Sequence, residues 1–296
     1  MLPSTATIVY PLIAALIFVF SALFIKRTAD FGVGLWRTTF VANIVVAILF
    51  SALWSFGGKP VVWQLLWQPF VIALMLFSGQ LCQFFALEKG DVSVAVPVFG
   101  LKVILVAFLT PILIGEHVGL KLWIAAFLSV AGVTLLNRKD EGKSPTNIGI
   151  TLISGGVGAI CFALFDVLVQ KWAPDWGVGR ILPLIFGMNA ILSLALIPMF
   201  KSPLRDIPRP VWRPLLCGSA LLGIQSIIFV STFAVYGRAT AANIAYSSRG
   251  LWSVVLVFLV GHWFNNQEQH LGPKVMRWRL AGSTLMMTAI VLVMTK

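Results

Sequence analysis

The chain reads VSVAVPVFGLKVILVAFLTPILI from Val92 to Ile114, and Lys102 is the only charged residue in this stretch. A single helix needs roughly 17–25 apolar residues to cross a bilayer core about 30 Å thick. A charged side chain at that depth is costly and usually marks a site or a pathway. The stretch therefore predicts a transmembrane helix that carries a cation within it.

The whole chain has the composition of a membrane protein. Of its 296 residues 59% are hydrophobic and 11% are charged, whereas soluble proteins have about 45–50% apolar and about 25% charged residues. This composition excludes a soluble enzyme, a disordered chain and a free nucleic-acid binder. We attribute the net charge of +12 to basic loops that orient the helices and lie against anionic lipid.

Nine further apolar stretches resemble residues 92–114, and together they predict ten transmembrane helices. The ten lie near residues 8–25, 35–55, 68–87, 92–114, 119–136, 148–170, 180–200, 214–236, 240–261 and 278–295. The connections are too short to hold an extramembrane domain. The predicted fold class is therefore an all-α membrane protein with ten transmembrane helices.

The two halves of the chain align with each other in order. Ala159–Phe165 overlays Ala14–Phe20, and Thr240 overlays Ser93 at a similar offset. We therefore predict a first five-helix repeat over residues 1–137, a linker over 138–147 and a second five-helix repeat over 148–296. A unit with an odd number of spans inverts its second copy, which is typical of alternating-access carriers.

The motifs of the first half resemble a known family. They are Ala86–Ala95 (ALEKGDVSVA), Pro97, Pro111, Gly115-Glu116 and Ala131–Leu136 (AGVTLL). This pattern resembles the EamA-type module of the drug/metabolite transporter (DMT) superfamily, present here as two tandem copies. The second copy departs from the pattern, because Gly261-His262 stands where Gly-Glu is expected and Glu268 lies in an inserted loop. The resemblance implies a secondary transporter.

Two cations lie deep in corresponding helices. Lys102 and Arg249 are separated by 147 residues, the same offset as the residues around them. With few acids at this depth, we expect the two cations to form the floor of a central site for a substrate anion. The alternative is structural pairing with an acid, for which Glu88, Glu116 and Asp166 (near the end of the sixth predicted helix) are available.

Other polar or aromatic side chains at similar depth complete the candidate site. The further candidate substrate-binding residues are Tyr246, Ser247, Ser248, Trp252, Gln80, Gln83 and Asn243. Asp166 and Glu116 are the candidates for proton coupling. A polar side chain in a bilayer often only bridges helices, so for any single amide we keep that second interpretation open.

The sequence does not support an intramembrane enzyme. His117, His262 and His270 lie at helix ends or in a loop, and neither an H-E-x-x-H pair nor paired carboxylates occur. We expect a secondary transporter that moves a small organic metabolite, preferably an anionic one, with no metal and no cofactor. A non-transporting membrane scaffold or a small channel is the alternative.

The expected surroundings follow from this function. The partners are a small-molecule substrate and the lipid bilayer, without nucleic acid, and the protein is a monomer or homodimer in the cell membrane. Orientation stays open. Most basic loop residues follow odd-numbered helices, which places the termini outside by the positive-inside rule, whereas the family resemblance places them inside.

Overall fold

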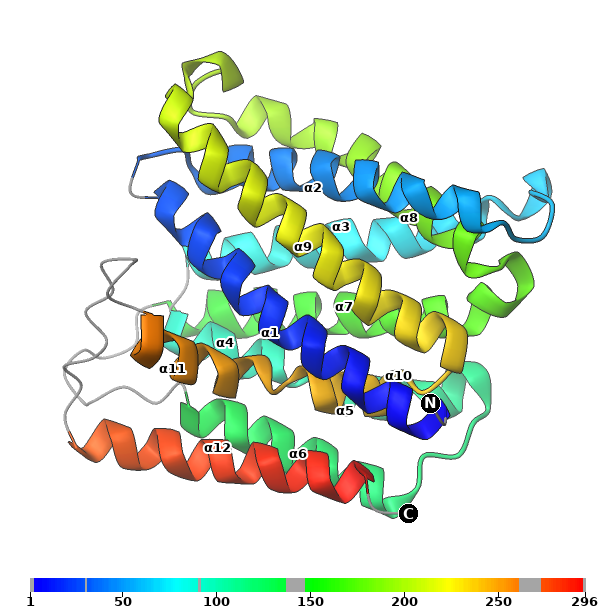
Figure 1. Ribbon diagram of the computed structural model, residues 1–296, viewed down its shortest axis with the longest axis vertical. Coiled ribbons are helices and arrows are strands. Elements are labelled where there is room, and N and C mark those ends of the chain that lie inside the picture. The colour runs from blue at the N-terminus through cyan, green and yellow to red at the C-terminus, as the bar shows by residue number, and fades with distance from the viewer. Residues whose placement is uncertain (1–2, 30, 90–91, 137–146, 261–272, 295–296) are drawn as a thin grey trace.

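The computed structural model describes residues 3–29, 31–89, 92–136, 147–260 and 273–294, and these ranges are built from helices and short connections (Figure 1). The α-helices are α1 (Pro3–Ala29), α2 (Leu35–Ser51), α3 (Trp67–Glu88), α4 (Val92–Gly100), α5 (Lys102–Ile114), α6 (Leu120–Leu136), α7 (Ile148–Trp176), α8 (Val178–Leu192), α9 (Arg209–Tyr236), α10 (Ala239–Tyr246), α11 (Arg249–Val260) and α12 (Pro273–Met294). Short 3₁₀ helices are η1 (Ala52–Phe56), η2 (Trp63–Leu65), η3 (Ser193–Met199) and η4 (Leu204–Asp206).

Seven helical segments of the described ranges are long and apolar enough to cross a membrane. They are Thr5–Thr28, Leu35–Phe56, Trp63–Glu88, Val94–Ile114, Ile148–Trp176, Val178–Met199 and Arg209–Tyr236, and the apolar helix α6 is shorter. The all-helical membrane fold is thus confirmed, and each of the ten predicted stretches coincides with helix.

The fourth and ninth predicted helices are each broken in two. α4 ends at Gly100 and α5 begins at Lys102, while α10 ends at Tyr246 and α11 begins at Arg249. Glycine is a poor helix former, which favours a break at Gly100. At the second break the Ser247 hydroxyl donates to the carbonyl oxygen of Ile244, 2.6 Å away, and such local bonds compete with the helix.

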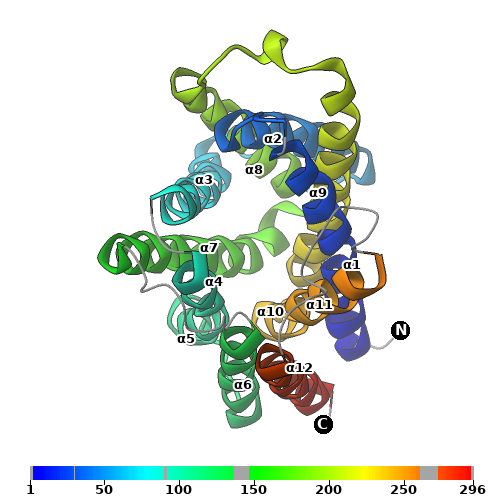
Figure 2. The same ribbon diagram turned by 90° about the vertical axis from the view of Figure 1, so that its left-hand side faces the viewer.

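Helices from the two halves of the chain pack against each other. α1 packs against α9, α3 against α7, and α2 against α8. At the far side of the bundle α6 stands beside α12 (Figure 2). A Cβ atom at Gly282 of α12 would lie 2.7 Å from the carbonyl oxygen of Gly132 on α6, so the absence of a side chain permits this close approach.

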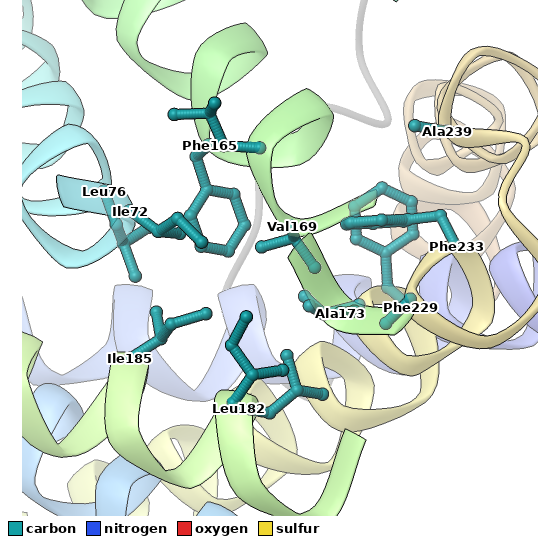
Figure 3. Packing of buried hydrophobic residues seen from close by; sticks show 14 of the residues in the cluster. Ile72, Leu76, Phe165, Val169, Ala173, Leu182, Ile185, Phe229, Phe233 and Ala239 are labelled. Carbon is teal, nitrogen blue, oxygen red and sulfur yellow. The ribbon is translucent and has the colours of Figure 1, made fainter. Parts of the chain in front are cut away.

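The largest hydrophobic cluster forms around α7 (Figure 3). Its buried members on α7 include Phe165, Val169 and Ala173, and they contact apolar residues of α3, α8 and α9. Packing on several sides fixes the position of α7. The polar residues on the same part of α7, Asp166 and Gln170, are therefore held at defined positions.

Candidate functional site

The helix breaks bring both predicted cations to the start of a helix. Lys102 is the first residue of α5, and Arg249 is the first residue of α11. The backbone stays in the right-handed helical region at Leu101 and Ser247. The amides of Leu105 and Trp252 donate to the carbonyl oxygens of Leu101 and Ser248, so backbone hydrogen bonding continues across both positions. A cation in either helix gains from a nearby negative group.

Lys102 has such a group in Asp166. The Lys102 ammonium lies 2.7 Å from Oδ2 of Asp166, whose side chain is fully buried on α7. Asn243 of α10 donates from Nδ2 to the same oxygen at 2.7 Å. Oδ1 of Asp166 has no hydrogen-bond partner in the described part of the chain. The interaction of Lys102 is thus the structural pairing that the sequence left open.

The sequence-based placement of Asp166 near a helix end is wrong. The sixth predicted helix was expected to end near residue 170, but α7 continues to Trp176. The longer helix places Asp166 in its interior, within reach of α5 and α10. This extra length explains why one acid lies at the same depth as Lys102.

Aromatic rings lie next to both cations. The Lys102 ammonium lies 5.9 Å from the ring centre of Phe162 and 5.6 Å from that of Phe229. The Arg249 guanidinium lies 5.0 Å from the ring centres of both Phe18 and Tyr246. Because Phe229 and Tyr246 stack at 4.2 Å, the two cations belong to one connected cluster. Cations over aromatic rings gain electrostatic stabilisation.

Hydrogen bonds fix the position of Tyr246. Its hydroxyl donates to Oε1 of Gln225 at 2.9 Å, and Nε2 of Gln225 donates to the hydroxyl of Ser226 at 2.7 Å. At the next residue, the hydroxyl groups of Ser247 and Ser129 lie 2.8 Å apart. α10 is therefore held by side chains of α6, α7 and α9.

The surroundings of Arg249 are different from those of Lys102. Arg249 is exposed in the protein alone, and the ion pairs found among the described residues do not include it. The neighbouring Ser248 hydroxyl and the indole N–H of Trp252 are buried, and neither has a hydrogen-bond partner in those residues. A cation and two neutral groups that lack a hydrogen-bond partner in the described residues thus occur within one turn of helix.

The remaining predicted residues lie in other contacts. Gln80 on α3 forms two reciprocal hydrogen bonds with Asn43 on α2, at 3.0 and 3.1 Å, so it bridges these helices. Gln83 is half-buried on α3. Glu116 follows α5 and accepts a hydrogen bond at 2.9 Å from Gln170, one turn beyond Asp166 on α7. The structure therefore does not gather all the predicted residues into one cluster.

Sequence reasoning missed three aromatic members of the cluster. Phe18, Phe162 and Phe229 carried no distinguishing signal, because the chain has 22 phenylalanines. At the offset of 145 residues Phe162 aligns with Ile17 rather than with Phe18, so the alignment of the halves did not identify them either. Their proximity to the cations depends on tertiary packing.

The described helices and their buried polar cluster define a multi-pass membrane protein. Residues 5–138 match the EamA-like transporter family. This part of the chain is therefore an EamA-like domain of the DMT superfamily, as the resemblance of the sequence implied. A domain of this family implies membrane transport and not enzymatic catalysis.

A solved structure has a fold similar to that of this chain over nearly its whole length. It is described as "Crystal structure of protein", has 16% sequence identity and a TM-score of 0.74, and the match covers 97% of this chain and 96% of that one. The comparison with curated proteins finds no match.

Proposed function

We propose that the protein is an alternating-access secondary carrier in the cell membrane that moves a small organic anion. The first support is the pattern of helix contacts. α1 packs against α9 as α7 packs against α3, while α2 pairs with α8 and α6 with α12. An axis that exchanges α1–α6 with α7–α12 gives this pattern, as two inverted repeats over residues 1–137 and 148–296 would.

The second support is that one of the two cations has an acidic partner in the described residues and the other has none. This difference is the main argument for an anionic substrate. At the offset of 145 residues the counterpart of Asp166 is Ser21. The Ser21 hydroxyl donates to the carbonyl oxygen of Gly218 at 2.7 Å, so this position supplies no negative charge. The cluster of Lys102, Asp166 and Arg249 therefore has a formal charge of +1. A single anionic group on the substrate neutralises it.

The groups around Arg249 fit a carboxylate or a phosphate. Guanidinium can donate two parallel N–H bonds to such a group. Ser248 and Trp252 have hydrogen-bonding groups without a partner in the described residues. The rings of Phe18 and Tyr246 limit where the guanidinium can move. We assign Arg249 as the main anion-binding residue and Lys102 as its neighbour at the same site.

Asp166 gives this site a route to proton coupling. Its carboxylate holds Lys102, so protonation of Asp166 would remove the negative partner and leave Lys102 to attract an anionic oxygen. Binding of a proton and binding of an anion would then favour each other. Glu116 remains a second candidate, since its Oε2 already accepts a hydrogen bond from Gln170.

Solute counterflow in proteoliposomes tests the proposal. The purified protein is reconstituted into liposomes, and each batch is loaded with one unlabelled solute from a panel of carboxylates, phosphate esters, neutral metabolites and amines. Uptake of the same solute in labelled form is then measured. We expect counterflow of an anionic solute that falls at least tenfold in Arg249→Gln and is unchanged in Arg205→Gln. Arg205 is an exposed arginine whose side chain is 88% accessible.

Three outcomes would contradict the proposal. Absence of counterflow for the whole panel would favour the scaffold, and flux that does not saturate would favour a channel. Normal anion transport by Arg249→Gln, or transport of amines and neutral solutes only, would remove the anion site. An imposed pH gradient tests the role of Asp166 separately, because transport that ignores the gradient would exclude proton coupling.

A further inference from the structure

A cavity of about 570 Å³ lies at the end of the bundle where α5 ends and α10 begins. It is formed by α1, α5, α6, α7, α10, α12 and the connection between α5 and α6. Its polar lining includes Thr110, Glu116, Lys121, Arg238 and Thr240. Arg249 lies ten residues along the chain from Ala239, which corresponds to about 15 Å of helical rise. The cavity is therefore separate from the site proposed around Arg249.

The N-terminus of α10 opens into this cavity. Arg238 precedes the helix in a left-handed conformation (φ 40°), and no side chain caps the first turn from that position. The amide of Ala239 donates to Oε1 of Gln170 at 2.8 Å. The next amides, those of Thr240 and Ala241, belong to the first turn and have no acceptor within the helix. Both residues line the cavity.

A buried hydroxyl at the same place also has no partner. Thr240 is only 3% exposed, and its Oγ1 has no hydrogen-bond partner in the described ranges. Thr110 on another wall is different, because its hydroxyl donates to the carbonyl oxygen of Val106 at 2.7 Å. Most buried polar groups in proteins have a hydrogen-bond partner, and a ligand that contacts Thr240 can supply one.

The charges of the lining favour an anion. Arg238 and Lys121 are cationic, Glu116 is anionic and His117 also lines the cavity. The Glu116 carboxylate accepts a hydrogen bond from Gln170, which disperses part of its charge. Arg238 is exposed beside the first turn of α10 and supplies positive charge there.

We propose that this cavity is a second binding site, for an oxyanion held by the first turn of α10. A carboxylate or phosphate oxygen would accept from the amides of Thr240 and Ala241 and from the Thr240 hydroxyl, while Arg238 supplies the opposite charge at the mouth. The oxyanion comes from a free solute or from the head group of an anionic lipid, since Ile8 and Leu292 give the same cavity an apolar wall. The site does not depend on the transport proposed above.

Calorimetric titration of the purified full-length protein tests this site. Inorganic phosphate is the probe in one arm, and a short-chain phosphatidylglycerol is the probe in the other, both in phosphate-free buffer. The test variants are Thr240→Val, which removes the hydroxyl at nearly constant volume, and Arg238→Gln. The controls are Thr110→Val, whose hydroxyl already has an acceptor, and Arg205→Gln, which removes an exposed arginine outside both proposed sites.

We expect each test variant to weaken binding about tenfold, as loss of a hydrogen bond or charge at an anion does, while the two controls bind like the wild type. If the test variants weaken the binding of phosphate, the cavity is a site for a free solute. If they weaken only the binding of phosphatidylglycerol, the cavity is a site for a lipid head group. If Thr240→Val does not fold, Arg238→Gln alone tests the site. Arg238 is exposed, so we expect its replacement to leave folding intact.

Other results would overturn the site. They are absence of binding in both arms, equal weakening by Thr240→Val and Thr110→Val, or equal weakening by Arg238→Gln and Arg205→Gln. Retained phosphate binding without any counterflow would contradict only the transport proposal. The two proposals therefore fail separately.

Discussion

The ammonium group of Lys102 lies 2.7 Å from Oδ2 of the fully buried Asp166. This ion pair distinguishes Lys102 from Arg249, the cation at the corresponding position of the second half. One cation is neutralised within the protein, and the other lies beside hydrogen-bonding groups that lack partners in the described part of the chain. The pair therefore links the stability of the central helices to the charge of the proposed site.

The first prediction concerns the stability contributed by this pair. Asp166→Asn should destabilise the protein by about 3–5 kcal/mol, because removal of one partner leaves a desolvated charge without compensation. The double variant Lys102→Met with Asp166→Asn should recover most of that loss. The measurement is reversible unfolding in mixed micelles, followed by tryptophan fluorescence.

Asp206→Asn is the matched control for this comparison. The Arg205–Asp206 contact is exposed and spans 3.9 Å, and surface pairs of this kind contribute about 0–1 kcal/mol. Unfolding of Asp166→Asn at the same denaturant concentration as the wild type would show that the buried pair is not important for stability.

The second prediction separates the hydroxyl of Tyr246 from its ring. Tyr246→Phe removes the bond to Gln225 and should cost about 1–3 kcal/mol, since the Gln225 oxygen stays buried. Tyr246→Ala also removes the stacking on Phe229 and should cost about 3–5 kcal/mol, as loss of a large buried side chain does. The same unfolding measurement applies, and equal costs for the two variants would be evidence against a packing role for the ring.

The location of the helices was predictable from the sequence, because the thickness of the bilayer determines how long an apolar stretch must be. The breaks after Gly100 and Tyr246 were not predicted. Each interruption lies within one long helical stretch of the sequence, so the length of the stretch alone does not reveal it. Gly261-His262, Glu268 and His270, which were considered in the sequence analysis, lie outside the described residues.

The candidate site was predictable only in part. Charge at bilayer depth identified Lys102 and Arg249, because such residues are rare in an apolar chain. The partner of Lys102 was one of three acids in the sequence, and only the length of α7 and its packing select Asp166. The amide pair of Gln80 with Asn43 shows why a polar residue at the correct depth need not belong to the site.

The third prediction tests the contact between α6 and α12. Gly282→Ala should destabilise the protein, because the added Cβ would lie 2.7 Å from the carbonyl oxygen of Gly132 and 2.9 Å from the amide nitrogen of Leu136, which are backbone atoms. We expect a cost of about 1–3 kcal/mol, as for other overpacked positions. Gly156→Ala on α7 is the control, since nothing lies within 4 Å of its added Cβ. The measurement is thermal unfolding in detergent. A lower unfolding temperature for Gly156→Ala than for Gly282→Ala would contradict this account.

The last prediction concerns the different roles of the two cations in transport. Arg249→Lys keeps the positive charge but removes the planar group that binds an anion through two parallel hydrogen bonds. Its KM for the transported anion should therefore rise about tenfold, the effect of losing one hydrogen bond to a charged group.

Lys102→Arg should have a smaller effect on KM, because the pairing of Lys102 with Asp166 makes it a secondary contact for the substrate. Initial rates of counterflow, measured over a range of anion concentrations with equal amounts of reconstituted protein, give both values. The reverse order, with Lys102→Arg raising KM more than Arg249→Lys, would mean that Lys102 is the principal anion-binding residue. The ion pair with Asp166 would then have to open before the substrate binds.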